Sequence, residues 1–205
     1  MIPRAKKNLH ACEYHLNNLI NSKNFEELEI NFAAFVSSAR SVTFVLQKEF
    51  KNNNNFLPWY GNPDSPESSK ENTKINEMQT DELCRFFVLL RNSIEKEGIN
   101  GLNCSTTIKS FNSSSDLPDR PTGSSISISG QGIYYLINEG TPKEDLVPAK
   151  AKVGAEINTS IFINNPPHLH LGKKIENPNL IELSKLYFEY LKNLVEEWTG
   201  IINNN

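Results

Sequence analysis

Apolar residues recur at three- and four-residue steps in three segments before residue 100 and again near the C-terminal end. The longest stripe begins at Asn24, which can cap a helix while Glu27 completes a capping box. It continues to Phe50, a length of about 40 Å at 1.5 Å per residue. Gly98 is a natural stop for the third stripe. The pattern predicts helices over residues 4–21, 25–50, 80–97 and 178–199.

Between residues 101 and 172 the pattern changes to β-branched, alternating runs such as SSISISG and GIYYLI, separated by Gly, Pro, Asn and Asp. Such runs predict four or five strands of one antiparallel sheet. The last helix carries too much apolar surface to stand alone, so we expect it to return to the other helices. We therefore predict an α+β fold, a four-helix bundle with an antiparallel β-sheet inserted between the third and fourth helices. Residues 1–98 and 178–205 form the bundle, and residues 99–177 form an insertion packed on it within a single structural domain.

The composition is that of a globular protein, because 38% of the 205 residues are hydrophobic and 22% are charged. A net charge of −3 argues against a polynucleotide held by bulk electrostatics, which needs a local excess of Lys and Arg. No secretory signal and no run of about 20 apolar residues is found, so no membrane partner is expected. Three cysteines without a CxxC pair fit buried thiols in a reducing compartment. We expect a cytoplasmic protein, and no cofactor is predicted.

The stretch LLRNSIEKEG, residues 89–98, presents four polar side chains where the third predicted helix ends: Arg91, Asn92, Lys96 and Glu97. Arg91 falls about 80° from the centre of the predicted buried face, and Arg40 has the same relation to the second helix. Both lie at the edge of the buried face of their helix, and both could line one polar groove. The alternative is that each lies along apolar surface and pairs with a carboxylate, since Glu95 is one turn beyond Arg91.

A helical bundle with Arg-Asn near a helix end, followed by a charged turn, resembles the HEPN superfamily. The wider pattern ARSVTFVLQKEF, FLPWY, TDELCRFF and LLRNSIEKEG is similar to a family of uncharacterised bacterial proteins associated with this bundle. The resemblance covers residues 1–98 and does not extend to the predicted sheet. It implies a homodimer, because HEPN domains are dimeric bundles in nucleotide-processing and defence proteins. Active members are metal-independent ribonucleases with an Arg-x(4–6)-His motif.

The chain departs from that motif, because Lys96 stands five positions after Arg91 and no histidine occurs within the motif's range. Histidine titrates near neutrality and can accept a 2′-hydroxyl proton, whereas lysine with its usual pKa of about 10.4 is protonated. The resemblance therefore favours a non-catalytic binding module for an anionic ligand, a nucleotide, RNA or a protein, at a groove that includes Arg40, Arg91, Asn92 and Lys96. One alternative is a ribonuclease or nucleotide-processing toxin with Glu97 as a base. Another is a purely structural role.

His168 and His170, in PPHLHLG, are two residues apart on a predicted strand and would face the same side. That spacing suits a metal, but two histidines make half a site and no Cys or acidic partner is near in sequence. Pairing with the backbone or with Glu176 is the alternative, and no metal is predicted. Trp59 and Tyr60 are expected to cover the bundle rather than to stack on a base.

Overall fold

The computed structural model divides the chain into two compact units. The helical unit comprises residues 1–101 and 165–205, and the strand unit comprises residues 102–164. The structure describes residues 3–62, 64, 72–98, 101–110, 121–129, 132–148 and 156–204. The α+β class is confirmed. The strand unit is shorter at both ends than the predicted insertion over residues 99–177.

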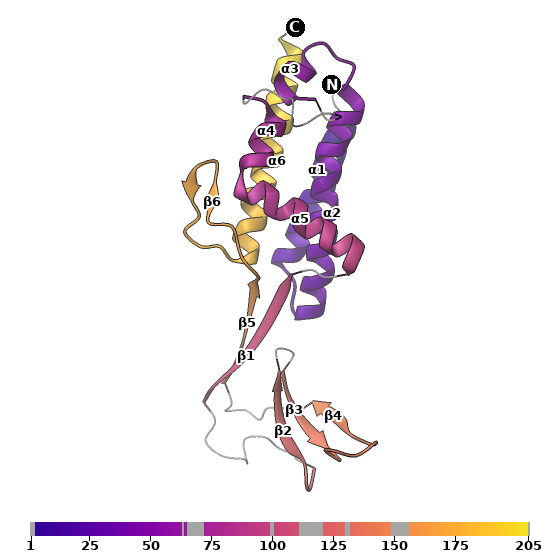
Figure 1. The fold of residues 1–205 in the computed structure, drawn as a ribbon, viewed down its shortest axis with the longest axis vertical. Coiled ribbons are helices and arrows are strands. Elements are labelled where there is room, and N and C mark those ends of the chain that lie inside the picture. The colour runs from indigo at the N-terminus through magenta and orange to yellow at the C-terminus, as the bar shows by residue number, and fades with distance from the viewer. Residues whose placement is uncertain are drawn as a thin grey trace. The chain divides into compact units, whose positions relative to one another are not determined.

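The four predicted helices are all present, and two short helices lie between the second and third, where none was predicted (Figure 1). The bounds are α1 Pro3–Ile20, α2 Phe25–Phe50, α3 Phe56–Tyr60, α4 Lys74–Thr80, α5 Glu82–Glu97 and α6 Leu180–Asn203. The predicted third helix began at residue 80, but Asp81 is extended and separates α4 from α5. None of the described helices combines the length and the hydropathy that crossing a bilayer requires.

Local hydrogen bonds explain why the helices begin and end where they do. The Asn24 side chain accepts the N–H of Glu27 at 2.8 Å, and the Glu27 carboxylate accepts the N–H of Lys23 at 2.9 Å. The first bond satisfies a donor that the first turn of α2 leaves without a partner, and the second holds the residue that precedes the cap. Gly98 ends α5 with φ 69°, a left-handed conformation that glycine adopts without strain.

The core of the helical unit lies between α1, α2 and α6, which run side by side, while α5 crosses them (Figure 1). The buried apolar positions of α2 follow the predicted stripe, from Phe32 to Leu46. Phe87 of α5 stacks on Tyr187 of α6, with ring centroids 4.3 Å apart. Because α5 crosses the other helices, it buries only one narrow face and leaves the opposite face exposed.

The strands form three small antiparallel sheets among the described residues, so the prediction of one sheet is wrong. In the strand unit, β1 (Leu102–Ser110) pairs with β5 (Glu156–Ile163), and β3 (Gly132–Ile137) lies between β2 (Ser125–Ser129) and β4 (Asp145–Pro148). The third sheet belongs to the helical unit and is the hairpin of β6 (Leu169–His170) and β7 (Lys173–Lys174). Alternation along a strand identifies the buried face and says nothing of the partner strand.

An aromatic cluster closes one end of the helical unit. Trp198 of α6 is fully buried and stacks on Trp59 at a centroid distance of 5.2 Å. Phe56 lies edge-on to Trp198 and is stacked on Tyr60. The FLPWY segment therefore covers the helices, as expected, with Phe56 and Tyr60 buried and Trp59 half-buried.

We predict that Trp198→Ala lowers the free energy of unfolding by about 3–5 kcal/mol, because it removes the largest buried side chain of this cluster. Urea unfolding followed by helical circular dichroism measures the change. The matched control is Ile30→Ala on α2, where the side chain is 62% exposed and the expected change is within about 0.5 kcal/mol. Equal losses in the two variants would contradict this assignment of the core.

Candidate functional site

A pocket of about 400 Å³ lies where α4 covers the outer sides of α2 and α5. Its polar wall comprises Arg40 and Gln47 of α2, Gln79 of α4 and Arg85 of α5, together with Tyr60. Its apolar wall comprises Ile75, Met78 and Val88. We call this cavity the arginine pocket. Its volume is within the range of small-molecule sites, roughly 300–1,000 Å³.

The two guanidinium groups of the arginine pocket are not neutralised by the side chains around them. Arg40 donates from Nη1 to the Thr43 hydroxyl at 2.7 Å, and this partner carries no charge. Arg85 has no side-chain hydrogen bond or ion pair with any residue that the structure describes, and no Asp or Glu is among the described lining residues. Two cations in a partly enclosed cavity raise the local positive potential and favour an anion there.

Tyr60 forms the buried base of the same pocket. Gln47 donates from Nε2 to the Tyr60 hydroxyl at 2.8 Å, which fixes both side chains. Burial raises the pKa of Tyr60 to about 12, although the Gln47 hydrogen bond and the Arg40 charge each act to lower it. The phenol is therefore neutral at physiological pH and does not cancel the charge of Arg40.

The other predicted site residues lie elsewhere on α5. The Arg91 guanidinium pairs with Glu95 one turn further on and also donates to the Asn92 side chain at 3.1 Å. Glu97 accepts a hydrogen bond from the Ser93 hydroxyl, and Lys96 is exposed. Arg91, Asn92, Lys96 and Glu97 are not among the residues that line the arginine pocket. The structure thus brings Arg40 together with Arg85 and not with Arg91.

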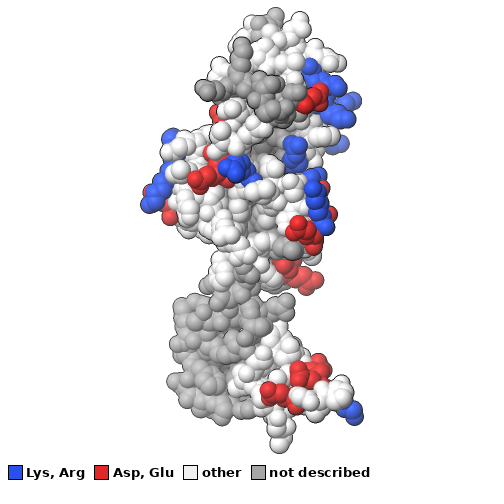
Figure 2. All heavy atoms as spheres, in the orientation of Figure 1, with Lys and Arg blue, Asp and Glu red and all other residues white. Residues whose placement is uncertain are grey.

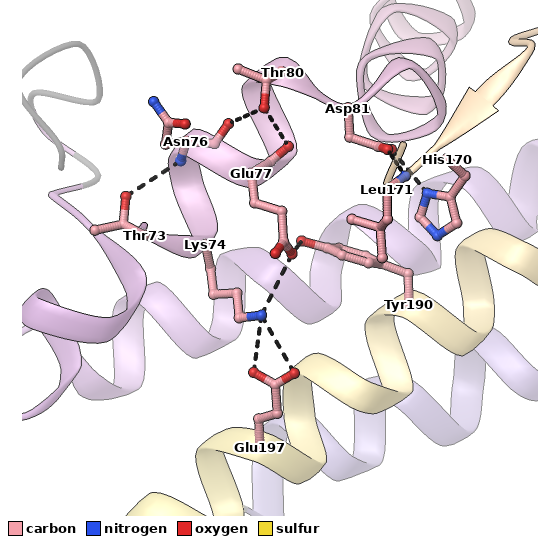
Figure 3. Close-up of polar contacts among 10 residues, drawn as sticks. All are labelled: Thr73, Lys74, Asn76, Glu77, Thr80, Asp81, His170, Leu171, Tyr190 and Glu197. Atoms are coloured by element: carbon pink, nitrogen blue, oxygen red, sulfur yellow. Dashed lines mark hydrogen bonds and ion pairs between the residues drawn. The ribbon is translucent and has the colours of Figure 1, made fainter. Parts of the chain in front are cut away.

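The position of α4 over the pocket depends on Asp81, at the corner between α4 and α5 (Figure 3). One carboxylate oxygen caps α5 by accepting the N–H of Cys84 at 2.9 Å and lies 3.0 Å from Nδ1 of His170. The other accepts the N–H of Leu171 at 2.6 Å. Leu171 has φ 49° in the two-residue turn of the hairpin, a costly conformation for a branched residue, and this bond helps to hold it.

Asp81 is ionised over the whole physiological range. Burial alone would raise its pKa, but the hydrogen bonds from His170, Leu171 and Cys84 together lower the pKa to about 2. Its side chain is only 4% exposed, so the bonds act in a protected environment. The Asp81 carboxylate therefore joins α4, α5 and the β6–β7 hairpin at one point.

A second polar chain ties α4 to α6 on the side away from the arginine pocket. The Tyr190 hydroxyl donates to Glu77 at 2.9 Å, and Lys74 lies 3.0 Å from Glu197 and 3.5 Å from Glu77 (Figure 3). A cavity of about 290 Å³ adjoins these side chains and His170. Three glutamates (Glu77, Glu189 and Glu197) and one lysine (Lys74) line it, so its excess charge is negative, opposite to that of the arginine pocket.

The predicted histidines have separate partners. His170 contacts Asp81 through Nδ1, whereas His168 donates its backbone N–H to the Glu82 carboxylate at 2.9 Å. Among the residues that the structure describes, no three His, Cys, Asp or Glu side chains lie close enough to hold a metal ion. Glu176, the expected partner, pairs with Lys174 instead. The aspartate that orients His170 is 89 residues away in sequence, too far for spacing to reveal it.

Sequence analysis did not identify Arg85 as a site residue. At 100° per residue, Arg85 points about 160° away from Leu83 at the centre of the buried face, so the sequence predicts an exposed side chain. Only α4, folded over α5, gives it a pocket to line. The sequence does contain one signal for α4, which is Thr73 directly before KINEMQT. Threonine is a common helix cap, and Thr73 caps α4 by accepting the N–H of Asn76.

Charges of the two signs are interspersed over the helical unit on the face that Figure 2 shows. That distribution is unlike the continuous basic stripe of a polynucleotide track. Two positive charges do meet at the arginine pocket, a cavity of small-molecule size.

The fold and the pocket define an α+β protein whose helical unit has a cavity lined by two arginines. A family model described as bacteriophage lambda protein ea47 matches residues 4–190, and the chain belongs to this family. No curated protein and no solved structure gives a significant match to the chain. The description of the family states no activity, so the function has to be argued from the site.

We predict that the stability of the helical unit decreases as the pH falls from about 4 towards 2. The pKa of Asp81 is about 2 in the folded protein and 3.8 ordinarily, so its contribution is present above pH 3.8 and is lost as the carboxylate protonates. At pH 7, Asp81→Asn should lower the free energy of unfolding by about 1–3 kcal/mol, because it removes a buried charged acceptor while keeping a helix cap.

Urea unfolding at several pH values measures both effects. The control is Glu189→Gln, at an exposed carboxylate of α6, which should change the free energy of unfolding by less than about 0.5 kcal/mol. An Asp81→Asn variant as stable as the unmodified protein at pH 7 would mean that the corner does not depend on this carboxylate.

Proposed function

We propose that the protein is a non-catalytic binding module that accepts an anionic ligand in the arginine pocket. The observation that carries the proposal is the pairing of Arg40 and Arg85 in one cavity without a carboxylate among its described lining residues. A guanidinium presents a planar fork of donors that matches phosphate and carboxylate oxygens. Two such forks facing one cavity are a suitable receptor for a group with several anionic oxygens.

The remaining walls support a ligand that is part anion and part flat apolar group. Ile75, Met78 and Val88 offer an apolar surface beside the arginines. Gln79 supplies an amide that can donate and accept hydrogen bonds. Gln47 uses one N–H for the Tyr60 hydroxyl, and its second N–H and its carbonyl oxygen can also bond a ligand. A nucleotide has this chemistry, and a net charge of −3 with interspersed signs favours such a small ligand over a long polyanion.

The ribonuclease alternative receives less support. It needs a base within hydrogen-bond reach of Arg91, and the partners that described residues give that guanidinium are Asn92 and Glu95. Lys96 and Glu97 are exposed at the end of α5, and neither is among the described side chains that pair with Arg91. We therefore propose binding rather than catalysis.

The relation to HEPN bundles, the homodimer and a cytoplasmic location remain parts of this proposal. The helical content and α6 returning to α1 and α2 support the first. The free, buried thiols of Cys12 and Cys84 are compatible with a reducing compartment.

We predict that the full chain binds inorganic pyrophosphate and that Arg85→Ala weakens this binding by about ten- to hundredfold, since a charged hydrogen-bonding partner is lost. Arg40→Gln should weaken it similarly while keeping a polar side chain near Thr43. Isothermal titration calorimetry at fixed ionic strength measures both. Replacing pyrophosphate by adenosine monophosphate then tests whether the apolar wall adds affinity.

The matched control is Arg91→Ala, which removes the same charge from a position outside the pocket. It should leave the affinity within about twofold of the unmodified protein, apart from the long-range effect of one charge. If Arg91→Ala weakens binding as much as Arg85→Ala, the protein attracts anions through its general charge and has no site at this pocket. If no binding of either probe is detected, the proposal is wrong.

A further inference from the structure

The outer face of α5 exposes an apolar residue that the helical unit does not use. Leu89 is 64% exposed, and Val88 beside it is 42% exposed. A shallow depression of about 230 Å³ adjoins Leu89, and its other lining residues are Glu82, Arg85, Phe86, Asn165 and Pro167. An exposed leucine beside a depression with apolar and charged walls is a feature of association surfaces. We infer that a second copy of this chain docks here, with its own α5 antiparallel to the first.

The charges along this face explain why the occupant is a second copy. At 100° per residue, Glu82 and Lys96 lie within about 20° of the direction of Leu89, one on each side of it. Each is seven residues from Leu89, or about 10 Å along the helix axis. A twofold axis beside Leu89 therefore places Glu82 of one copy opposite Lys96 of the other, twice, with the two Leu89 side chains meeting at the centre.

The two charged groups are prepared for this pairing in different ways. The Glu82 carboxylate is held in place because one of its oxygens accepts the N–H groups of His168 and Leu169 at 2.9 and 3.1 Å. A fixed carboxylate loses little freedom when it gains a partner. Lys96 makes no hydrogen bond or ion pair with the residues that the structure describes, so its charge is available.

The charge pattern also selects one orientation. In a parallel arrangement, each Glu82 would face the other copy's Glu82 and each Lys96 the other copy's Lys96, which is repulsive at both ends. In the antiparallel arrangement both ends attract. Charge pairs at the rim of an interface determine register more than affinity, so the leucines supply the association and the charges its direction. One helix pair is a small interface, and we expect a dimer that dissociates on dilution.

This inference rests on the proposed homodimer and names its surface. Sedimentation equilibrium of the full chain over a range of concentrations should show a monomer–dimer equilibrium. Leu89→Glu should weaken the dimer by at least about tenfold, because it places two like charges at the twofold axis. The matched control is Ile30→Glu on α2, since Ile30 is equally exposed at 62% and lies outside this face. It should leave the equilibrium unchanged.

A charge exchange tests the register. Lys96→Glu should weaken the dimer, because the new glutamate faces Glu82 of the second copy. The double variant Glu82→Lys, Lys96→Glu should restore it to within about threefold, provided that circular dichroism shows an unchanged helical content. A dimer that Leu89→Glu leaves intact would overturn the inference and keep the homodimer. A monomer at every concentration would overturn both, while the pyrophosphate titration would still decide the arginine pocket separately.

Discussion

The helical unit depends on one carboxylate at the corner between α4 and α5. Asp81 interrupts the helix, caps the segment that follows, and accepts hydrogen bonds from the hairpin at Leu171 and His170. A buried carboxylate with these donors is strongly stabilised as an anion, and each donor would be left without a partner if it were removed. The direction of α4 is set at this point, and α4 is the wall that turns the exposed sides of α2 and α5 into a cavity.

The two faces of α4 have different chemistry, although the helix has only seven residues. Lys74 and Glu77 form paired charges towards α6, while Ile75 and Met78 present apolar groups towards the arginine pocket. On the side of α4 that faces α6, Lys74 is paired with Glu77 and Glu197. On the other side, Arg40 and Arg85 line the pocket without a carboxylate among its described lining residues. For the proposed anion site, arginines beside a firmly held wall would be a preorganised receptor, because no described lining carboxylate has to be displaced.

The parts of the fold that sequence predicts well are those determined by burial along one helix. The stripe of α2 and its Asn24 cap follow from a repeat of 3.6 residues over many turns. The seven residues of α4 are too few to show such a repeat. Without α4, Arg85 is predicted to be an ordinary exposed side chain rather than part of a pocket. Arg91 and Arg40 have similar positions relative to their stripes, yet Arg91 pairs with Glu95 and Arg40 has no carboxylate partner among the described residues. The Arg91–Glu95 pair is local and was one of the alternatives that the sequence offers, whereas the cavity beside Arg40 depends on the tertiary position of α4.

The most direct test of an anion site at Arg40 and Arg85 is a titration of protein labelled with ¹⁵N-arginine, followed through the side-chain Nε–Hε signals. Inorganic pyrophosphate should shift the Arg40 and Arg85 signals along one common saturation curve and leave the Arg91 signal in place. The variants Arg40→Gln and Arg85→Ala assign those two signals. Shifts of similar size at all arginines, or a saturating shift at Arg91 alone, would contradict the account.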